Sequence, residues 1–223
     1  MSIQTKDLSE IASKSFDFMV KLTRDIGNLL LLIVLNLIPI VDFIVLGYFI
    51  NVVRRDASEP PKLSNFGGLF IEGLKLVIAA LIYFLIPLII LLVGVGGAIL
   101  SSFMRPFFIF RGITFILIVV AVLLLLLILF FALPILGIYM RTGDFAKIFA
   151  FGESWDLISR FGLGNYILFF LLLAGFNAIA FSIGSLLSWV GIAIVGVFAN
   201  AFTFKAVSLF VNIKYPLPPP PPP

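Results

Sequence analysis

The sequence predicts an all-α integral membrane protein, and its composition and its long apolar segments carry this prediction. Of its 223 residues, 62% are hydrophobic and 12% are charged, whereas a typical soluble domain has about 45–50% apolar and about 25% charged residues. A soluble fold of this length lacks the interior to bury so many apolar side chains, because small domains keep much of their surface in water. Four segments are apolar over the roughly 20 residues that a helix needs to cross a bilayer.

These four predicted transmembrane helices cover residues 76–100, 113–140, 166–187 and 190–213. Pro87 and Pro134 lie within the first two spans, where proline removes a helical hydrogen bond and favours a kink. Only Ser188 and Trp189 separate the last two spans. We therefore expect those two helices to form a tight hairpin.

A fifth apolar segment, 28–53, is interrupted by Pro39 and Asp42. It predicts either one helix kinked at Pro39 or two short helices that fold back as a half-depth hairpin. The hairpin places twelve Lys and Arg residues on the cytoplasmic side and two on the outside. A single span places eight on the cytoplasmic side and six on the outside. Lys205 is left out of both counts because it lies within a span. Since Lys and Arg accumulate on the cytoplasmic side, we expect the hairpin and a multi-pass protein of the cell membrane with both termini in the cytoplasm.

Amphipathic segments flank the spans. The cytoplasmic N-terminal segment, 1–27, contains an apolar stripe at helical spacing over 7–22, which predicts a helix on the membrane surface. Residues 66–75 lead into the first span, and 144–160 form another amphipathic region that we expect to break at Gly152. Each segment is expected to anchor at the interface, and docking of a protein partner is the alternative.

The chain therefore divides into the N-terminal segment, a single membrane domain over 28–213 and a tail over 214–223. The tail is rich in proline and predicts a polyproline II segment. It is expected to be either a stiff solvated tail or a ligand for an aromatic-lined groove on a partner.

The residue counts exclude most familiar membrane enzymes. The chain has no His and no Cys, which rules out His-based triads, HExxH metalloproteases and thiolate chemistry. The intramembrane segments contain one carboxylate, Asp42, whereas an aspartyl dyad needs two. There is no Walker motif. We expect a protein that is not an enzyme and uses no metal or cofactor. Its partner is the lipid bilayer rather than nucleic acid.

Polar residues within the predicted membrane segments form the candidate site, because ionisable groups are costly to bury there and are often functional. Asp42 lies at the bend of the hairpin and Lys205 in the last span. Ser208 and Asn212 continue a polar stripe from Lys205 at helical spacing, and Asn177 lies in the preceding span. One hypothesis pairs Asp42 with Lys205 in the core. In the alternative, Lys205 extends to the interface and Asp42 caps the second arm of the hairpin.

Short motifs surround the first spans. In the first half they are Leu46-Gly47-Tyr48-Phe49, Val52-Val53-Arg54-Arg55, Glu59-Pro60-Pro61, Phe66-Gly67-Gly68-Leu69-Phe70 and Glu72-Gly73-Leu74-Lys75. In the second half they are Gly143-Asp144-Phe145, Phe151-Gly152-Glu153 and Gly164-Asn165-Tyr166. Together they resemble a family of uncharacterised multi-pass membrane proteins from archaea and bacteria, domain of unknown function 4013. The resemblance covers most of 28–213 and implies no substrate or catalytic residue.

We therefore expect a non-catalytic membrane component such as a scaffold, a partner subunit or an envelope-maintenance factor. The alternative is a small transporter, channel or lipid-handling protein whose polar path lies near Asp42 and Lys205. A water-accessible cavity that reaches Asp42 would favour the alternative.

Overall fold

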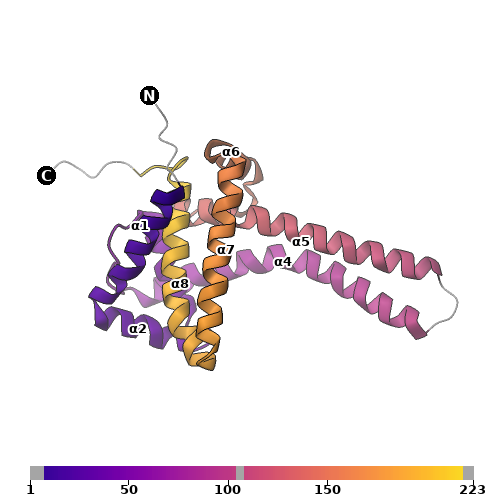
Figure 1. The fold of residues 1–223 in the computed structure, drawn as a ribbon, viewed down its shortest axis with the longest axis horizontal. Coiled ribbons are helices and arrows are strands. Elements are labelled where there is room, and N and C mark those ends of the chain that lie inside the picture. The colour runs from indigo at the N-terminus through magenta and orange to yellow at the C-terminus, as the bar shows by residue number, and fades with distance from the viewer. Residues whose placement is uncertain (1–7, 104–107, 218–223) are drawn as a thin grey trace. The chain divides into compact units, whose positions relative to one another are not determined.

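The computed structural model describes residues 8–103 and 108–217, and over these residues it consists of helices joined by short connections (Figure 1). The predicted all-α fold is therefore confirmed. Residue 7 of the predicted surface helix and residues 218–223 of the predicted proline tail lie outside the described residues. Contacts divide the chain into two compact units, which are described separately: Met1–Leu76 with Pro134–Pro223, and Val77–Leu133.

The first half of the chain forms α1 (Leu8–Lys21), the 3₁₀ helix η1 (Leu22–Arg24), α2 (Ile26–Leu37), α3 (Phe43–Arg55) and α4 (Phe66–Phe103). The second half forms α5 (Phe108–Thr142), the 3₁₀ helix η2 (Phe145–Phe149), α6 (Phe151–Phe161), α7 (Leu163–Ser185) and α8 (Ser188–Val211). Among the described residues, α4, α5, α7 and α8 are long and apolar enough to cross a membrane. They correspond to the four predicted spans, but α4 begins ten residues early because segment 66–75 continues into the span without a break.

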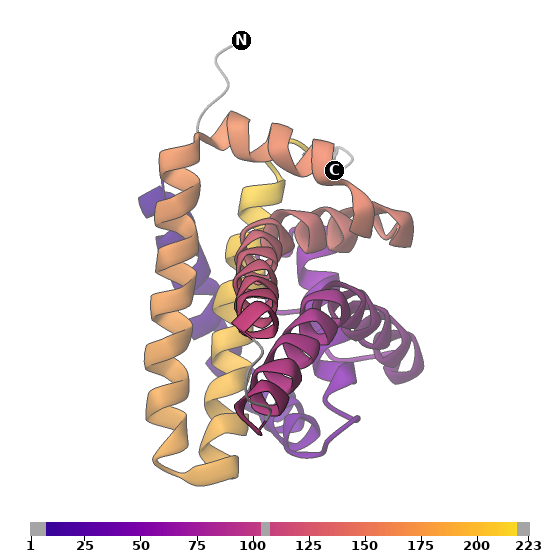
Figure 2. The ribbon, with the colours of Figure 1, turned by 90° about the vertical axis from the view of Figure 1, so that its right-hand side faces the viewer.

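The helix α8 is the centre of the first unit. It contacts α1, α2, α3 and α7. Within its apolar spanning segment, 61% is buried inside the protein, compared with 22% for the spanning segment of α7. Figure 2 shows α7 in orange and α8 in yellow running antiparallel, joined by a tight turn. Near this turn, a Cβ on Gly191 would overlap the carbonyl oxygen of Gly184. Small residues thus allow the close approach of the two helices.

Segment 28–53 forms two separate helices, α2 and α3. Between them Ile40 has a φ of 73°, a left-handed conformation that is rare for a β-branched residue. The bend lies against the first turns of α8: Asn36 Nδ2 donates to the Ala193 carbonyl at 2.8 Å, and Trp189 Nε1 donates to the Leu37 carbonyl at 3.1 Å.

The chain after α3 returns to the beginning of α2. Lys21 Nζ lies 2.6 Å from Glu59 Oε1, and the Asn28 side chain bonds to the backbone of Pro61 and of Leu63. The entry and the exit of this helix pair are therefore joined by protein contacts. How deeply the pair lies in a bilayer stays a prediction.

Two of the predicted amphipathic segments contain helices, α1 and α6, and one of them breaks at a different residue. In α1 the buried side chains are Ile11, Ser15 and Phe18, and this face packs within the first unit, whereas Phe16 of the predicted apolar stripe is 52% exposed. In region 144–160 the predicted break at Gly152 is wrong. The break lies at Ala150, whose carbonyl accepts the first helical hydrogen bond of α6, from Ser154 N.

The second unit consists of the apolar parts of α4 and α5. The two helices approach closely, since a Cβ on Gly94 would lie 2.9 Å from Ile118 Cγ1 and one on Gly97 would lie 2.5 Å from Thr114 Cγ2. An apolar pocket of about 330 Å³ is lined by Phe84, Pro87, Leu88, Leu91, Ala121, Val122 and Leu125. Leu81, Ile86 and Leu123 each expose at least 60% of their area within this unit, which suits a surface in contact with lipid.

Candidate functional site

Lys205 forms an ion pair with Asp56, the residue that follows α3. Its Nζ lies 2.9 Å from Asp56 Oδ1, and the residue is 5% exposed. The hypothesis that pairs Lys205 with Asp42 is therefore wrong, because the Lys205 ammonium group reaches the connection after α3 instead. Sequence reasoning missed Asp56 because it lies outside the apolar segments, in a stretch that resembles an ordinary polar loop.

The three residues of the polar stripe, two in α8 and one directly after it, converge on the Asp56 carboxylate. Besides Lys205, Ser208 Oγ donates to Oδ1 at 2.8 Å and Asn212 Nδ2 donates to Oδ2 at 3.0 Å. Asp56 has a φ of 47° and its backbone N–H closes the end of α3. Asp tolerates this left-handed conformation better than most residues do. The side chains that the sequence placed on one helical stripe therefore bind α8 to the end of α3 through Asp56.

Arg141, near the end of α5, is the second cation of this Asp56 cluster. Its Nη2 donates to the Ser208 carbonyl at 2.8 Å and to Ser208 Oγ at 3.2 Å. The residue is 6% exposed, and its Nε and Nη1 have no hydrogen-bond partner among the described residues. The cluster therefore holds two cations and one carboxylate.

The charges around Asp56 determine its protonation. Burial alone would raise the pKa of the Asp56 carboxyl, but the hydrogen bond and charge of Lys205, the bond from Ser208 and the charge of Arg141 act in the opposite direction. The net result is a pKa below the ordinary value, so the carboxylate is ionised at neutral pH.

The two remaining candidate residues make other contacts. Asn177 donates to the Leu173 carbonyl at 2.8 Å and to Thr203 Oγ1 at 2.9 Å, so it links α7 to α8. Asp42 directly precedes α3, but its side chain makes no capping hydrogen bond, contrary to the capping alternative. Its buried Oδ1 has no hydrogen-bond partner among the described residues.

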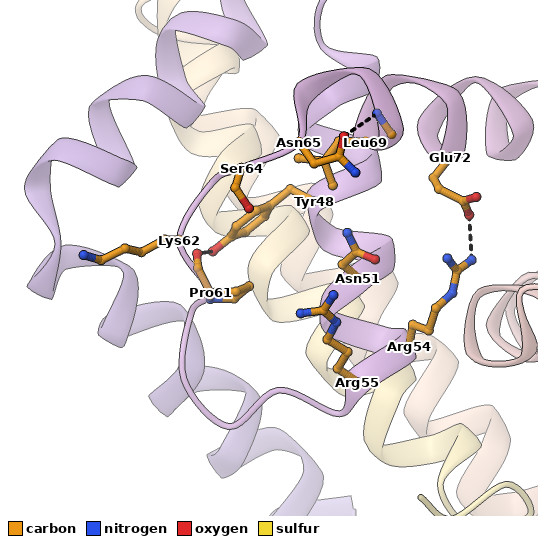
Figure 3. Close-up of a pocket in the computed structure, with 11 residues that line it drawn as sticks. Tyr48, Asn51, Arg54, Arg55, Pro61, Lys62, Ser64, Asn65, Leu69 and Glu72 are labelled. Carbon is orange, nitrogen blue, oxygen red and sulfur yellow. Dashed lines mark hydrogen bonds and ion pairs between the residues drawn. The ribbon is translucent and has the colours of Figure 1, made fainter.

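The second feature is a polar pocket of about 300 Å³ beside the end of α3 (Figure 3). It is lined by Tyr48, Asn51, Arg54, Arg55, Pro61, Lys62, Ser64, Asn65, Gly68, Leu69 and Glu72. These residues belong to α3, to the connection that follows it and to the first turns of α4. The motifs on which the family resemblance rests supply most of the pocket wall.

Two glycines bring α3 and α4 into backbone contact beside this pocket. A Cβ on Gly47 would overlap the carbonyl of Leu69, and one on Gly73 would overlap the carbonyl of Phe43. Tyr48 then fixes the connection between the helices, because its hydroxyl donates to the Pro61 carbonyl at 2.9 Å. The pocket is therefore shaped by close packing of its two helices and by a tethered connection.

The pocket has an excess of positive charge. Its lining contains Arg54, Arg55 and Lys62 but one carboxylate, Glu72. Arg54 Nη2 lies 2.6 Å from Glu72 Oε2, and Lys75 Nζ lies 3.0 Å from Glu72 Oε1, so both carboxylate oxygens are engaged. Arg55 and Lys62 are exposed, and neither makes an ion pair or a hydrogen bond within the part of the chain that the structure describes.

The geometry and composition together define an all-α membrane protein with helices of spanning length, a buried ionic clamp and a cationic pocket. Residues 30–189 match the family model described as "Protein of unknown function (DUF4013)", and the chain belongs to this family. This confirms the resemblance seen in the sequence. No curated protein and no solved structure matches the chain. The matched region contains every residue of the pocket and ends before Lys205, Ser208 and Asn212, which bind Asp56.

Proposed function

We propose that the protein is a non-catalytic component of the cell membrane that acts as a scaffold or partner subunit. The observation that carries this proposal is the Asp56 cluster. Lys205 and Ser208 of the central helix α8, together with Asn212 directly after it, bind the Asp56 carboxylate at 2.8–3.0 Å, and Ser208 is fully buried. Such groups serve the fold and are not available to a moving solute.

Two pockets of the described residues support the same proposal. Neither the polar pocket at α3 nor the apolar pocket of the second unit is lined by Asp42 or Lys205. A polar path near these two residues was the basis of the transporter alternative. Residues suited to contact a membrane or a partner lie instead on η2 and α6, where Phe149, Phe151 and Trp155 are 46–61% exposed.

A flux assay tests the proposal. Vesicles that contain the purified chain are expected to pass ions and small solutes no faster than empty vesicles, and Asp56→Asn should not alter this rate. In native membranes, the tagged chain should purify with other proteins at a fixed ratio. Flux that depends on Asp56, or a chain that purifies alone after mild extraction, would contradict the proposal.

A lipid-handling role is the second candidate function, and the cationic pocket at α3 favours it. The pocket lies where the polar connection 56–65 meets the first turns of a helix of spanning length. Headgroups and connecting loops share this level in membrane proteins.

A further inference from the structure

We propose that the pocket at the end of α3 binds a phosphate-type oxyanion, with Arg54, Arg55 and Lys62 as its cationic side. The ligand is either the headgroup of an anionic phospholipid or a free phosphate. This proposal goes beyond the scaffold role and does not depend on it.

Charge is the first argument. Three of the eleven lining residues are cations, and Glu72 is neutralised from both sides by Arg54 and Lys75. The exposed cations Arg55 and Lys62 keep their full hydrogen-bonding capacity for a ligand. Arginine is well suited to this role, because its planar fork of donors matches a phosphate group. The lining therefore has a net charge of two positive units.

Neutral donors complete the wall. The side chains of Asn51 and Ser64 line the pocket and make no hydrogen bond within the described residues. Figure 3 shows Asn51, Arg55 and Ser64 arranged around the pocket, with the Lys62 side chain extending away from them. Lys62 is thus placed at the rim, where its flexible stem allows it to turn toward a bound anion.

The pocket is organised before any ligand arrives. The Arg54 guanidinium group is held in place by two hydrogen bonds. Its Nη2 donates to Glu72, and its Nε donates to the Met140 carbonyl at 3.3 Å. The connection is fixed by Tyr48 and by Asn28 Oδ1, which accepts from Leu63 N at 2.9 Å. Binding to such a site costs less ordering than binding to a mobile loop.

The place of the pocket along the chain suits a headgroup. Its last lining residue is Glu72, and the continuous apolar run of α4 begins at Leu76, about one helical turn later. The positive end of the α4 dipole also points toward this region and adds to the field of the side chains.

The test compares two pairs of substitutions that remove equal charge. Arg55→Gln with Lys62→Gln removes the two unpaired cations of the pocket. Lys14→Gln with Arg160→Gln is the matched control, because these exposed residues pair with Glu10 and Asp156 on their own helices and line no part of the pocket. Native mass spectrometry in detergent measures retained phosphatidylglycerol against phosphatidylcholine, and calorimetry measures binding of inorganic phosphate.

The expected result is preferential retention of phosphatidylglycerol by the natural protein, weakened at least about tenfold in the pocket variant and unchanged in the control. Binding of inorganic phosphate without a preference for phosphatidylglycerol, lost in the pocket variant, supports the site with a soluble ligand instead. Equal binding by the natural protein and the pocket variant, or an equal loss in the control, overturns the proposal.

Two further variants guard against misfolding. Asn51→Asp keeps the shape of the side chain and adds a negative charge, so it should weaken binding as the pocket variant does. Arg55→Lys with Lys62→Arg keeps both charges and should retain most of the binding. If Asn51→Asp binds both probes like the natural protein, the proposal fails. A negative result leaves the scaffold role untouched, because that role is measured by flux and by purified complexes.

Discussion

Asp56 and Lys205 are 149 residues apart in the sequence, and their side chains meet at 2.9 Å. This contact fastens the end of α3 to the second half of α8. A buried ion pair is not necessarily stabilising compared with apolar residues of the same shape, but removing one partner leaves the other charge unpaired and is costly. The pair therefore acts as a constraint on how α3 and α8 meet.

The first prediction concerns the strength of this contact. Asp56→Asn keeps the left-handed backbone and the size of the side chain, but leaves Lys205 without a counter-charge. We expect the free energy of unfolding in detergent to fall by about 3 kcal/mol. Lys205→Met should also destabilise, and the double variant should lose clearly less than the sum of the two. Additive losses in this cycle would show that the two side chains are not coupled.

The second prediction concerns pH. Since the pKa of Asp56 is lowered in the folded state, its contribution to stability is present above the unfolded value of about 3.9. It is lost as the pH falls through the lower, folded value. The stability difference between the natural protein and Asp56→Asn should therefore shrink in this acidic range. Thermal unfolding of both proteins at a series of pH values measures it, and a difference independent of pH would contradict the assignment.

The third prediction tests the contact of α3 with α4. Gly47→Ala places a Cβ on the backbone of Leu69, where no side chain can move aside. We expect a loss of about 1–3 kcal/mol in unfolding free energy, as is typical of overpacking. Gly152→Ala is the control, because a Cβ there meets nothing within 4 Å. It should leave stability unchanged or slightly improved, and a similar effect at both sites would refute the close contact.

The fourth prediction concerns the segment after α8. The Tyr215 hydroxyl donates to Glu153 of α6, and Lys214 Nζ donates to the Glu153 carbonyl at 3.2 Å. Tyr215→Phe should increase hydrogen exchange of the backbone amides around 212–217, since it frees this segment locally.

Tyr139→Phe is the matched control for that exchange experiment. The Tyr139 hydroxyl is buried and has no hydrogen-bond partner among the described residues. Its removal should leave exchange at 212–217 unchanged. If both substitutions raise exchange equally, the Tyr215–Glu153 bond does not hold the segment.

The fifth prediction concerns topology. The natural chain has no cysteine, so a single introduced cysteine reports its own position without background. A cysteine at position 4 should react with a membrane-impermeant reagent only after the membrane is opened, because the distribution of Lys and Arg predicts a cytoplasmic N-terminus. Labelling from the outer face of intact cells would favour the single-span alternative for 28–53.

Much of the fold could be predicted from hydropathy, because a bilayer imposes a length and a composition on each helix that crosses it. The stripe of Lys205, Ser208 and Asn212 was also predictable, since it depends only on helical spacing. Its partner Asp56 was not, because no local pattern marks a contact between a polar connection and a helix 149 residues later. The sequence suggested Asp42 only because it is the carboxylate within an apolar segment.

The pocket was even harder to predict from the sequence than the Asp56 contact. In the sequence, its Lys and Arg residues indicate only the cytoplasmic side of the membrane, and this statistical preference of loops says nothing about where the side chains meet. The excess of cations at one place follows from the closeness of α3 and α4 at Gly47 and Gly73 and from the bonding of Glu72 by Arg54 and Lys75. The position of the helix break at 144–160 was also not predictable from glycine alone. Glycine is tolerated in the first turn of a helix, and Gly152 lies in the first turn of α6, after the break at Ala150.

The central position of α8 sets an order of events during synthesis. α1, α2 and α3 all pack against α8, yet every one of them leaves the ribosome before any part of it does. Until Ser188–Val211 arrives, the Asp56 carboxylate has no ammonium group to bind, and the buried faces of the early helices have no matching surface. The three early helices can therefore reach their final packing only after α8, the last helix of the chain's described part, has been made.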